Sequence, residues 1–323
     1  MHPINYGPAQ LLALQGATPS RFTYQNPYQE QPLKFRIKAR PAPAPFGEKS
    51  NLVLLDPDHP TEATTRPSSS LSEGKVESDS PDFVLKVEQS SEQVKTGSNS
   101  LKLSASNRSS KRSSWATYSF KLNEPLDLTE NRAIGLWVFG DASGTKLNIR
   151  LDDGAYFSRS HYIPLDFSGW KYCELAEPSV DPVIEYPYPG YTLASLRNFA
   201  YNKVGFVTLL LTDAPPGKTV TCYLTRVEAL KEHPTILVHP TLTLNGSAVR
   251  FPVTLENNQY VEFWGDRNAT VYDKNGHTLR QFSLEGAPRL RAGSNRVELG
   301  HEADSDGRSE VRVELIAMGD AIR

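Results

Sequence analysis

A hairpin near the middle of the chain gathers charged, amide and aromatic side chains. Its turn, Asp152-Asp-Gly-Ala155, joins two segments in which polar and apolar residues alternate. A loop of two or four residues sets Leu151 opposite Tyr156, so that Leu147 and Ile149 share the core side with Ser160 and Ser158. The other side then collects a cationic face with one aromatic ring, made of Lys146, Asn148, Arg150, Phe157, Arg159 and His161.

Such a face has the chemistry of a sugar-binding site. Arginine forks bind carboxylate or sulfate groups through two parallel hydrogen bonds, and an aromatic ring stacks on the apolar side of a sugar. The pattern therefore predicts a site for an acidic polysaccharide or oligosaccharide. An ordinary solvated sheet face is the alternative interpretation.

A second cluster lies in Glu185-Tyr-Pro-Tyr-Pro-Gly-Tyr191, where Tyr186 and Tyr188 alternate with prolines. Tyrosine combines a large apolar ring with a polar tip, which suits glycan edges and protein partners alike. We therefore include Tyr186 and Tyr188 among the candidate ligand-binding residues. Packing of the loop against its own domain is the alternative.

No catalytic residues are assigned. The alternating Glu-x-Asp-x-x-Glu strand of a jelly-roll hydrolase is missing, and so are a Gly-x-Ser-x-Gly elbow and a phosphate-binding loop. His301-Glu302 has no matching histidine at position 305 and predicts a turn. A glycan lyase that uses Arg150, Arg159, His161 and a tyrosine on one sheet is the enzymatic alternative.

Two of the remaining residue types bear on the core. Cys173 and Cys222 fall on expected strands, and buried free thiols are favoured over a disulfide. Among the tryptophans, Trp137 and Trp264 are predicted core residues and Trp170 a packing residue. Polar residues precede Trp115, so the sequence is compatible with either an exposed or a buried ring.

Composition limits the class of protein. The 323 residues contain 35 basic and 37 acidic side chains, which gives a net charge of −2. A general nucleic-acid binder carries an excess of basic residues, so the charge balance excludes this class. No apolar run approaches the roughly 20 residues of a membrane span, and no signal peptide is visible at the N-terminus. The 24 prolines and 21 glycines, with many aromatic residues, are typical of a turn-rich all-β protein.

The strand pattern predicts three segments. Residues 1–50 hold one alternating strand, Leu33 to Ala39, followed by Pro41-Ala-Pro-Ala-Pro45, and we expect an extension or the end of a preceding domain with a proline-rich linker. Residues 51–232 carry many short strands separated by turn residues, which predicts a β-sandwich. Residues 233–323 begin a new strand series after Lys231-Glu-His-Pro234 and predict a small all-β accessory domain.

Six short sequence segments of residues 51–232, taken in their order, form a pattern that resembles a known family. They occupy residues 96–103, 126–128, 134–141, 143–153, 165–170 and 220–228. Together they resemble the galactose-binding-like jelly-roll domains that are appended as carbohydrate-binding modules to large bacterial polysaccharide-degrading enzymes. The resemblance implies a galactose-binding-like β-sandwich, an extracellular or periplasmic location, and other domains of a larger enzyme as partners. That family often holds a structural calcium near its first and last strands, but Thr225-Arg-Val-Glu228 lacks the Asp often found there.

The sequence therefore predicts a non-catalytic carbohydrate-binding or accessory region of an extracellular carbohydrate-active protein. Two alternatives stay open: a jelly-roll glycan lyase or hydrolase, and a purely structural spacer between domains.

Overall fold

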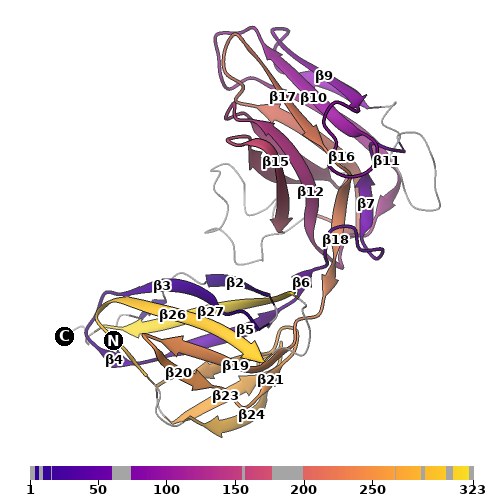
Figure 1. The fold of residues 1–323 in the computed structure, drawn as a ribbon. Coiled ribbons are helices and arrows are strands. Elements are labelled where there is room, and N and C mark those ends of the chain that lie inside the picture. The colour runs from indigo at the N-terminus through magenta and orange to yellow at the C-terminus, as the bar shows by residue number, and fades with distance from the viewer. Residues whose placement is uncertain are drawn as a thin grey trace. The chain divides into compact units, whose positions relative to one another are not determined.

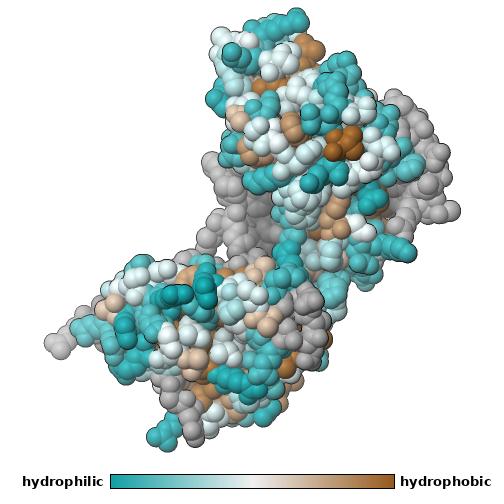
Figure 2. All heavy atoms as spheres, viewed as in Figure 1, coloured by the Kyte–Doolittle hydropathy of each residue, from teal (hydrophilic) through white to brown (hydrophobic). Residues whose placement is uncertain are grey.

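The computed structural model describes residues 4–6, 10–15, 17–59, 74–154, 157–176, 199–265, 267–284, 288–302 and 308–319. These residues form an all-β protein whose one short helix is a 3-10 turn, Tyr201–Lys203. The chain divides into two compact units (Figure 1): unit 1 comprises residues 1–42 and 233–323, and unit 2 comprises residues 43–232. Within the described part of the chain, no helix is long and apolar enough to cross a membrane. The visible face in Figure 2 is largely hydrophilic, with separate apolar patches.

Unit 1 is built from both ends of the sequence. Its N-terminal strands are β1 (Ile4–Tyr6), β2 (Gln10–Gln15), β3 (Ser20–Asn26), β4 (Gln31–Pro32) and β5 (Phe35–Arg40). Its C-terminal strands are β19 (Leu237–Leu244), β20 (Ser247–Arg250), β21 (Thr254–Leu255), β22 (Tyr260–Phe263), β23 (Asn268–Tyr272), β24 (Thr278–Ser283), β25 (Arg289–Leu290), β26 (Gly293–Glu302) and β27 (Arg308–Met318).

These strands pair across the two halves. One sheet has the order β1-β27-β5-β22-β23-β24, with β2 also paired to β27, and a second has the order β20-β19-β26-β3, with β21 beside β19. Strand β5 thus lies between β22 and β27, where Phe35, Ile37 and Ala39 are fully buried. The prediction of a separate extension over residues 1–50 is wrong, because both edges of this strand pair with strands more than 200 positions later and residues 1–42 form one unit with residues 233–323.

The proline-rich stretch is also more than a linker. Ala42–Pro43 forms the short strand β6 beside β18, and the Ala44 N–H donates to the Lys231 carbonyl at 2.8 Å. Residues 41–44 are buried. Proline suits this place because an edge strand leaves one side of its backbone unpaired.

Unit 2 is a sandwich of two sheets. The eight-stranded sheet has the order β6-β18-β12-β17-β10-β9, with β15 beside β12 and β7 beside β18, and the five-stranded sheet has the order β14-β13-β16-β11-β8. The strands are β7 (Leu52–Leu55), β8 (Lys75–Ser78), β9 (Phe83–Ser90), β10 (Ser100–Asn107), β11 (Trp115–Leu126), β12 (Asn131–Asp141), β13 (Lys146–Asp152), β14 (Ser158–Pro164), β15 (Ser168–Ala176), β16 (Val204–Thr212), β17 (Lys218–Leu224) and β18 (Val227–His233).

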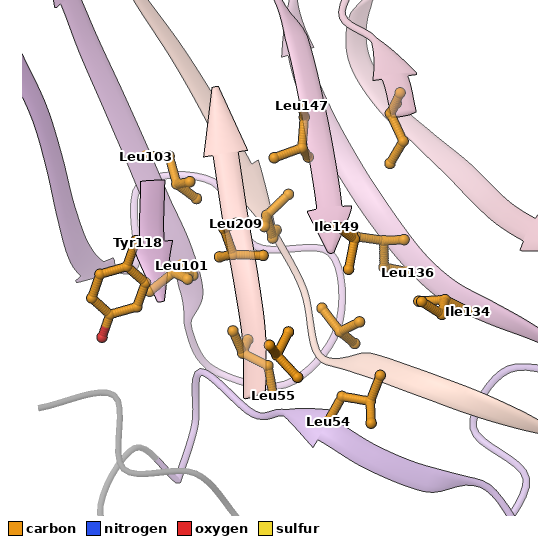
Figure 3. Packing of buried hydrophobic residues seen from close by; sticks show 14 of the residues in the cluster. Leu54, Leu55, Leu101, Leu103, Tyr118, Ile134, Leu136, Leu147, Ile149 and Leu209 are labelled. Carbon is orange, nitrogen blue, oxygen red and sulfur yellow. The ribbon is translucent and has the colours of Figure 1, made fainter. Parts of the chain in front are cut away.

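Alternation along these strands fills the space between the sheets. Leu147, Ile149 and Leu209 of the five-stranded sheet point toward Leu101, Leu103 and Leu136 of the other sheet (Figure 3), and all six are at most 1 % exposed. Each strand therefore presents its remaining side chains on an outer face.

Both cysteines are free and buried, as the sequence predicts. Cys173 on β15 faces Leu136 of β12, whereas Cys222 lies on β17, which pairs with β12 on its other side. Burial raises the pKa of the Cys173 thiol to about 11 and that of Cys222 further still. Both thiols are therefore protonated components of the core.

Candidate functional site: the polar face of unit 2

The register of the central hairpin decides which candidate residues share a face. In the structure Asp152 pairs with Ser158, Arg150 with Ser160 and Ile149 with His161. Five residues separate Asp152 from Ser158, whereas the predicted pairing requires an even number. An odd loop length turns the second strand over, so the predicted single cationic face is wrong.

Three of the six hairpin candidates lie on the core side. Arg159 is 3 % exposed and pairs with Leu151, and its Nε donates to the Tyr201 hydroxyl at 2.6 Å. His161 is buried too, with its Nδ1 3.0 Å from the Ile149 carbonyl oxygen. Phe157 packs against the hydrophobic core. These residues support the sandwich from within and do not form a ligand-binding face.

The other three candidates, Lys146, Asn148 and Arg150, do share an outer face. Cross-strand pairing extends this face over all five strands of the sheet. We call it the polar face; its side chains are Lys75, Glu77, Trp115, Thr117, Ser119, Lys121, Lys146, Asn148, Arg150, Asp152, Ser158, Ser160, Tyr162, Pro164, Phe206, Thr208, Leu210 and Thr212.

Hydrogen bonds fix the middle of the polar face. Asp152 Oδ2 accepts from Arg150 Nε at 3.2 Å and from Thr208 Oγ1 at 3.3 Å, and the Thr208 and Ser119 hydroxyls lie 2.9 Å apart. The network thus links β13, β16 and β11. Side chains held in this way lose little further freedom when a ligand binds, which favours affinity.

Asn148 joins the two strands of the hairpin, β13 and β14. Its Nδ2 donates to the Ser160 hydroxyl at 3.0 Å, and its Oδ1 accepts from the His161 N–H at 2.9 Å. The asparagine is only 1 % exposed. It therefore holds β13 and β14 together, with Tyr162 as its cross-strand partner. Its own amide is not exposed to a ligand.

Aromatic rings occur at separate points of the polar face. Trp115 is 37 % exposed and begins β11, opposite Thr212, while Tyr162 and Phe206 are half-buried on β14 and β16. None of these three rings is among the predicted site residues. The alternation on β11, in which Ala116, Tyr118 and Phe120 face the core, is the sequence signal that places Trp115 outside.

The two cations on the outer side of the hairpin have carboxylate partners. Lys146 Nζ lies 2.7 Å from Asp213 Oδ2, and Arg150 pairs with Asp152. The same face also carries the exposed pair Lys75 and Glu77 and one further exposed cation, Lys121. The face is therefore rich in hydrogen-bonding groups without being strongly cationic.

The opposite outer face, on the eight-stranded sheet, has a different character. Trp170, Phe139 and Tyr223 lie in one row across β15, β12 and β17, with Phe139 in edge contact with each neighbour at 5.6 and 5.8 Å. Trp137, predicted to be core, lies on this outer side, half-buried, with the Lys95 ammonium 4.6 Å above its ring. Because these rings contact one another and a cation covers Trp137, they form a packed aromatic layer.

The remaining predictions concern the tyrosine loop and calcium. Tyr186 and Tyr188 lie outside the described residues. Among residues that are described, no group of three or more His, Cys, Asp or Glu side chains is arranged to hold a metal ion. At the last strand of unit 2, the Glu228 carboxylate accepts from the Gly47 N–H, Asn51 Nδ2 and the Arg226 guanidinium, so protein groups already surround this acid. A structural calcium stays a prediction.

No family model and no curated protein matches the sequence. Similar solved structures are mostly carbohydrate-binding modules with jelly-roll folds. A family 11 module of the cellulase Lic26A-Cel5E from Clostridium thermocellum is 10 % identical and aligns with 49 % of this chain and 87 % of its own, with a TM-score of 0.35. The module TmCBM61, solved with β-1,4-galactotriose, is 14 % identical over 50 % of this chain and 90 % of its own, with a TM-score of 0.30. An exo-β-agarase is 10 % identical over 56 % of this chain and 25 % of its own, with a TM-score of 0.35.

Proposed function

We propose that unit 2 is a non-catalytic carbohydrate-binding module whose polar face takes a saccharide. The observation that carries this proposal is the exposed Trp115 ring on the same face as the partly exposed pair of Arg150 and Asp152, which the buried Thr208 hydroxyl holds in place. An aromatic ring offers a stacking surface for the apolar side of a sugar, and paired polar groups offer donors and acceptors to its hydroxyls.

We infer a preference for neutral over acidic sugars. An acidic glycan is favoured by unpaired cations, but Lys146 and Arg150 are each neutralised by an aspartate, and Arg159 and His161 face the core. A carboxylated sugar has to compete with Asp152 and Asp213 for these cations. Neutral hydroxyls add to the network without breaking it.

The same placement speaks against the lyase alternative. Its proposed set needs Arg150, Arg159 and His161 around one substrate, and the register divides them between two faces. A spacer role is favoured by an apolar or fully covered outer face. The polar face is neither, because its side chains are mostly polar and Trp115 is 37 % exposed, although Asn148 and Thr208 at its centre are buried. The wider setting, an accessory region of an extracellular or periplasmic enzyme that acts on polysaccharides, belongs to this proposal as well.

Calorimetric titration tests the proposal with two groups of probes: neutral cellotetraose, laminaritetraose and β-1,4-galactotriose, and acidic oligogalacturonate. We expect at least one neutral probe to bind, and Trp115→Ala and Arg150→Ala each to weaken it about tenfold or more, which corresponds to about 1.4 kcal/mol. Lys86→Ala, an exposed change on the eight-stranded sheet, is the matched control and leaves affinity unchanged.

The outcomes separate the alternatives. Binding of oligogalacturonate alone, weakened by salt, restores the acidic-glycan hypothesis. Release of unsaturated or reducing ends from a polysaccharide restores the enzymatic one. If no probe binds, or if both polar-face variants bind like the parent chain, the proposal fails.

A further inference from the structure

A tryptophan of unit 1 lies on the surface, contrary to the prediction that it belongs to the core. Trp264 is 43 % exposed and directly follows β22, whose Val261 and Phe263 fill the core instead. The next residue, Gly265, has a φ of +85°, which glycine adopts without strain, and a Cβ there would lie 3.0 Å from Pro32 Cβ. The glycine therefore turns the chain directly after Trp264, one residue beyond the end of the strand.

The exposed indole is held in place. Trp264 Nε1 donates to Glu262 Oε2 at 3.2 Å, and the other oxygen of Glu262 accepts from Arg36 Nε at 2.6 Å and pairs with Nη2 at 2.5 Å. Arg36 Nη1 also reaches Glu314 Oε2 at 3.4 Å. The hydrogen bond satisfies the polar atom of the indole and leaves its ring available.

More rings share this side of the sheet. Tyr260 lies two residues before Glu262, and its ring stacks on Tyr272 of the neighbouring strand with 5.0 Å between centroids and 19° between planes. The Arg36 guanidinium lies 5.5 Å from the Tyr260 centroid. At about 3.3 Å per residue, Tyr260 and Trp264 are some 13 Å apart along the strand, with an acid between them.

The charges of this surface are paired with one another. Arg36 lies between Glu262 and Glu314, and Arg312 Nε pairs with Glu314 Oε1 at 2.8 Å. Phosphate groups and nucleic acids are attracted by cations that lack a partner, whereas Arg36 and Arg312 each pair with a glutamate. Lys38, which lies between Tyr260 and Arg312 on the same face, also has an interaction partner. A hydroxyl-rich neutral ligand with apolar ring faces fits two aromatic positions separated by paired polar groups.

We propose that Trp264, Glu262, Arg36, Tyr260 and Tyr272 form a second saccharide-binding site, the tryptophan platform, on unit 1. A sugar ring stacks on the Trp264 indole, and its hydroxyls bond to Glu262 and Arg36. The ligand class is a neutral oligosaccharide. The site shares no residue with the polar face of unit 2, so either site is able to exist without the other.

Two-dimensional NMR of the full chain tests the platform through its indole N–H groups. The Trp264 signal is assigned by its loss in Trp264→Phe, and the titration is carried out in a Trp115→Ala background that disables the polar face. Cellotetraose, laminaritetraose and β-1,4-galactotriose are each added to about 10 mM, ten times a dissociation constant of 1 mM. We expect a saturable shift of the Trp264 signal with at least one of them.

Two further variants decide whether the shift reports binding at the platform. Trp264→Ala abolishes binding of the same probe in this background, and Glu262→Gln, which keeps the side-chain shape, weakens it about tenfold. Thermal unfolding of each variant verifies that unit 1 stays folded. A Trp264 signal unmoved by every probe, or probe affinity unchanged in folded Trp264→Ala, overturns the platform. If the parent chain binds a probe, the Trp115→Ala chain does not, and the Trp264 signal does not shift, the result supports the polar face and overturns the platform.

Discussion

Asn51 and Glu228 are 177 residues apart in sequence, and the Asn51 Nδ2 donates to Glu228 Oε2 at 2.9 Å in the interior of unit 2. The same carboxylate also accepts from the Gly47 N–H and from Arg226, and Asn51 Oδ1 accepts from the Lys231 N–H. A single buried acid thus fixes the segment before β7 onto the last strand of the sandwich.

Replacing Glu228 by alanine is expected to destabilise unit 2 by about 2–4 kcal/mol, because the Asn51 amide and the Gly47 N–H lose their buried acceptor and the partly exposed Arg226 loses its partner. Chemical denaturation followed by far-ultraviolet circular dichroism measures the change. Glu77→Ala, which removes an exposed acid, is the control and shifts stability by less than about 1 kcal/mol. A Glu228 variant as stable as this control contradicts the assignment.

The division of the chain predicts which fragments fold. Residues 43–232 alone are expected to unfold cooperatively, since both sheets of unit 2 lie within them. Residues 233–323 alone are expected to lack a folded state, because β5 is absent between β22 and β27. Joining residues 1–42 to 233–323 with a short Gly-Ser linker is expected to restore unit 1. The 2.8 Å hydrogen bond from the Ala44 N–H to the Lys231 carbonyl shows that the chain leaves unit 1 and returns to it at neighbouring positions. Cooperative unfolding of residues 233–323 by themselves refutes this.

The hairpin register predicts opposite effects for two arginines. Arg159→Ala is expected to lower the stability of unit 2 by about 1.5–3 kcal/mol and to leave sugar affinity unchanged, because the buried guanidinium bonds to Tyr201. Arg150→Ala is expected to weaken sugar binding and to change stability by less than about 1 kcal/mol, since its pair with Asp152 is partly exposed. Thermal unfolding and calorimetry on the same two variants measure both quantities. The reverse pattern supports the even-loop register.

The stability of unit 1 is expected to depend on pH through Glu302, an acid whose pKa is lowered in the folded state. Hydrogen bonds from Arg250 and then His239 lower the pKa of Glu302 from 4.5 to about 2. Because the folded pKa is depressed, its stabilising contribution is present above pH 4.5 and is lost as the pH falls toward 2. NMR titration of the Glu302 carboxyl carbon measures the pKa. Arg250→Ala is expected to raise it, while Arg280→Ala leaves it near 2; an unchanged pKa in Arg250→Ala refutes the cause.

Strand positions and most core residues could be predicted from the sequence, because alternation is a local property. Leu147, Ile149 and Leu151 are core residues by pattern and in the structure. The face of Arg159 could not be predicted, since one residue more or less in a loop inverts all later side chains. The partners of Phe35 and Ile37 lie in the C-terminal half, and pairing over such a separation leaves no local signal. The position of Trp264 could not be predicted, because it follows the core residue Phe263 directly and the sequence gives no local indication that the strand ends there.

The division of unit 1 between the two ends of the sequence has a consequence for synthesis. Strands β3 and β5 leave the ribosome before the roughly 190 residues of unit 2, whereas their partners β26, β22 and β27 come afterwards. At about 5–20 residues per second, the first strands wait some 10–40 s with unpaired edges, long enough for unit 2 to fold first. The Lys and Arg side chains that alternate along β5, at positions 36, 38 and 40, are the kind of charges that keep a strand without partners from pairing with another nascent chain.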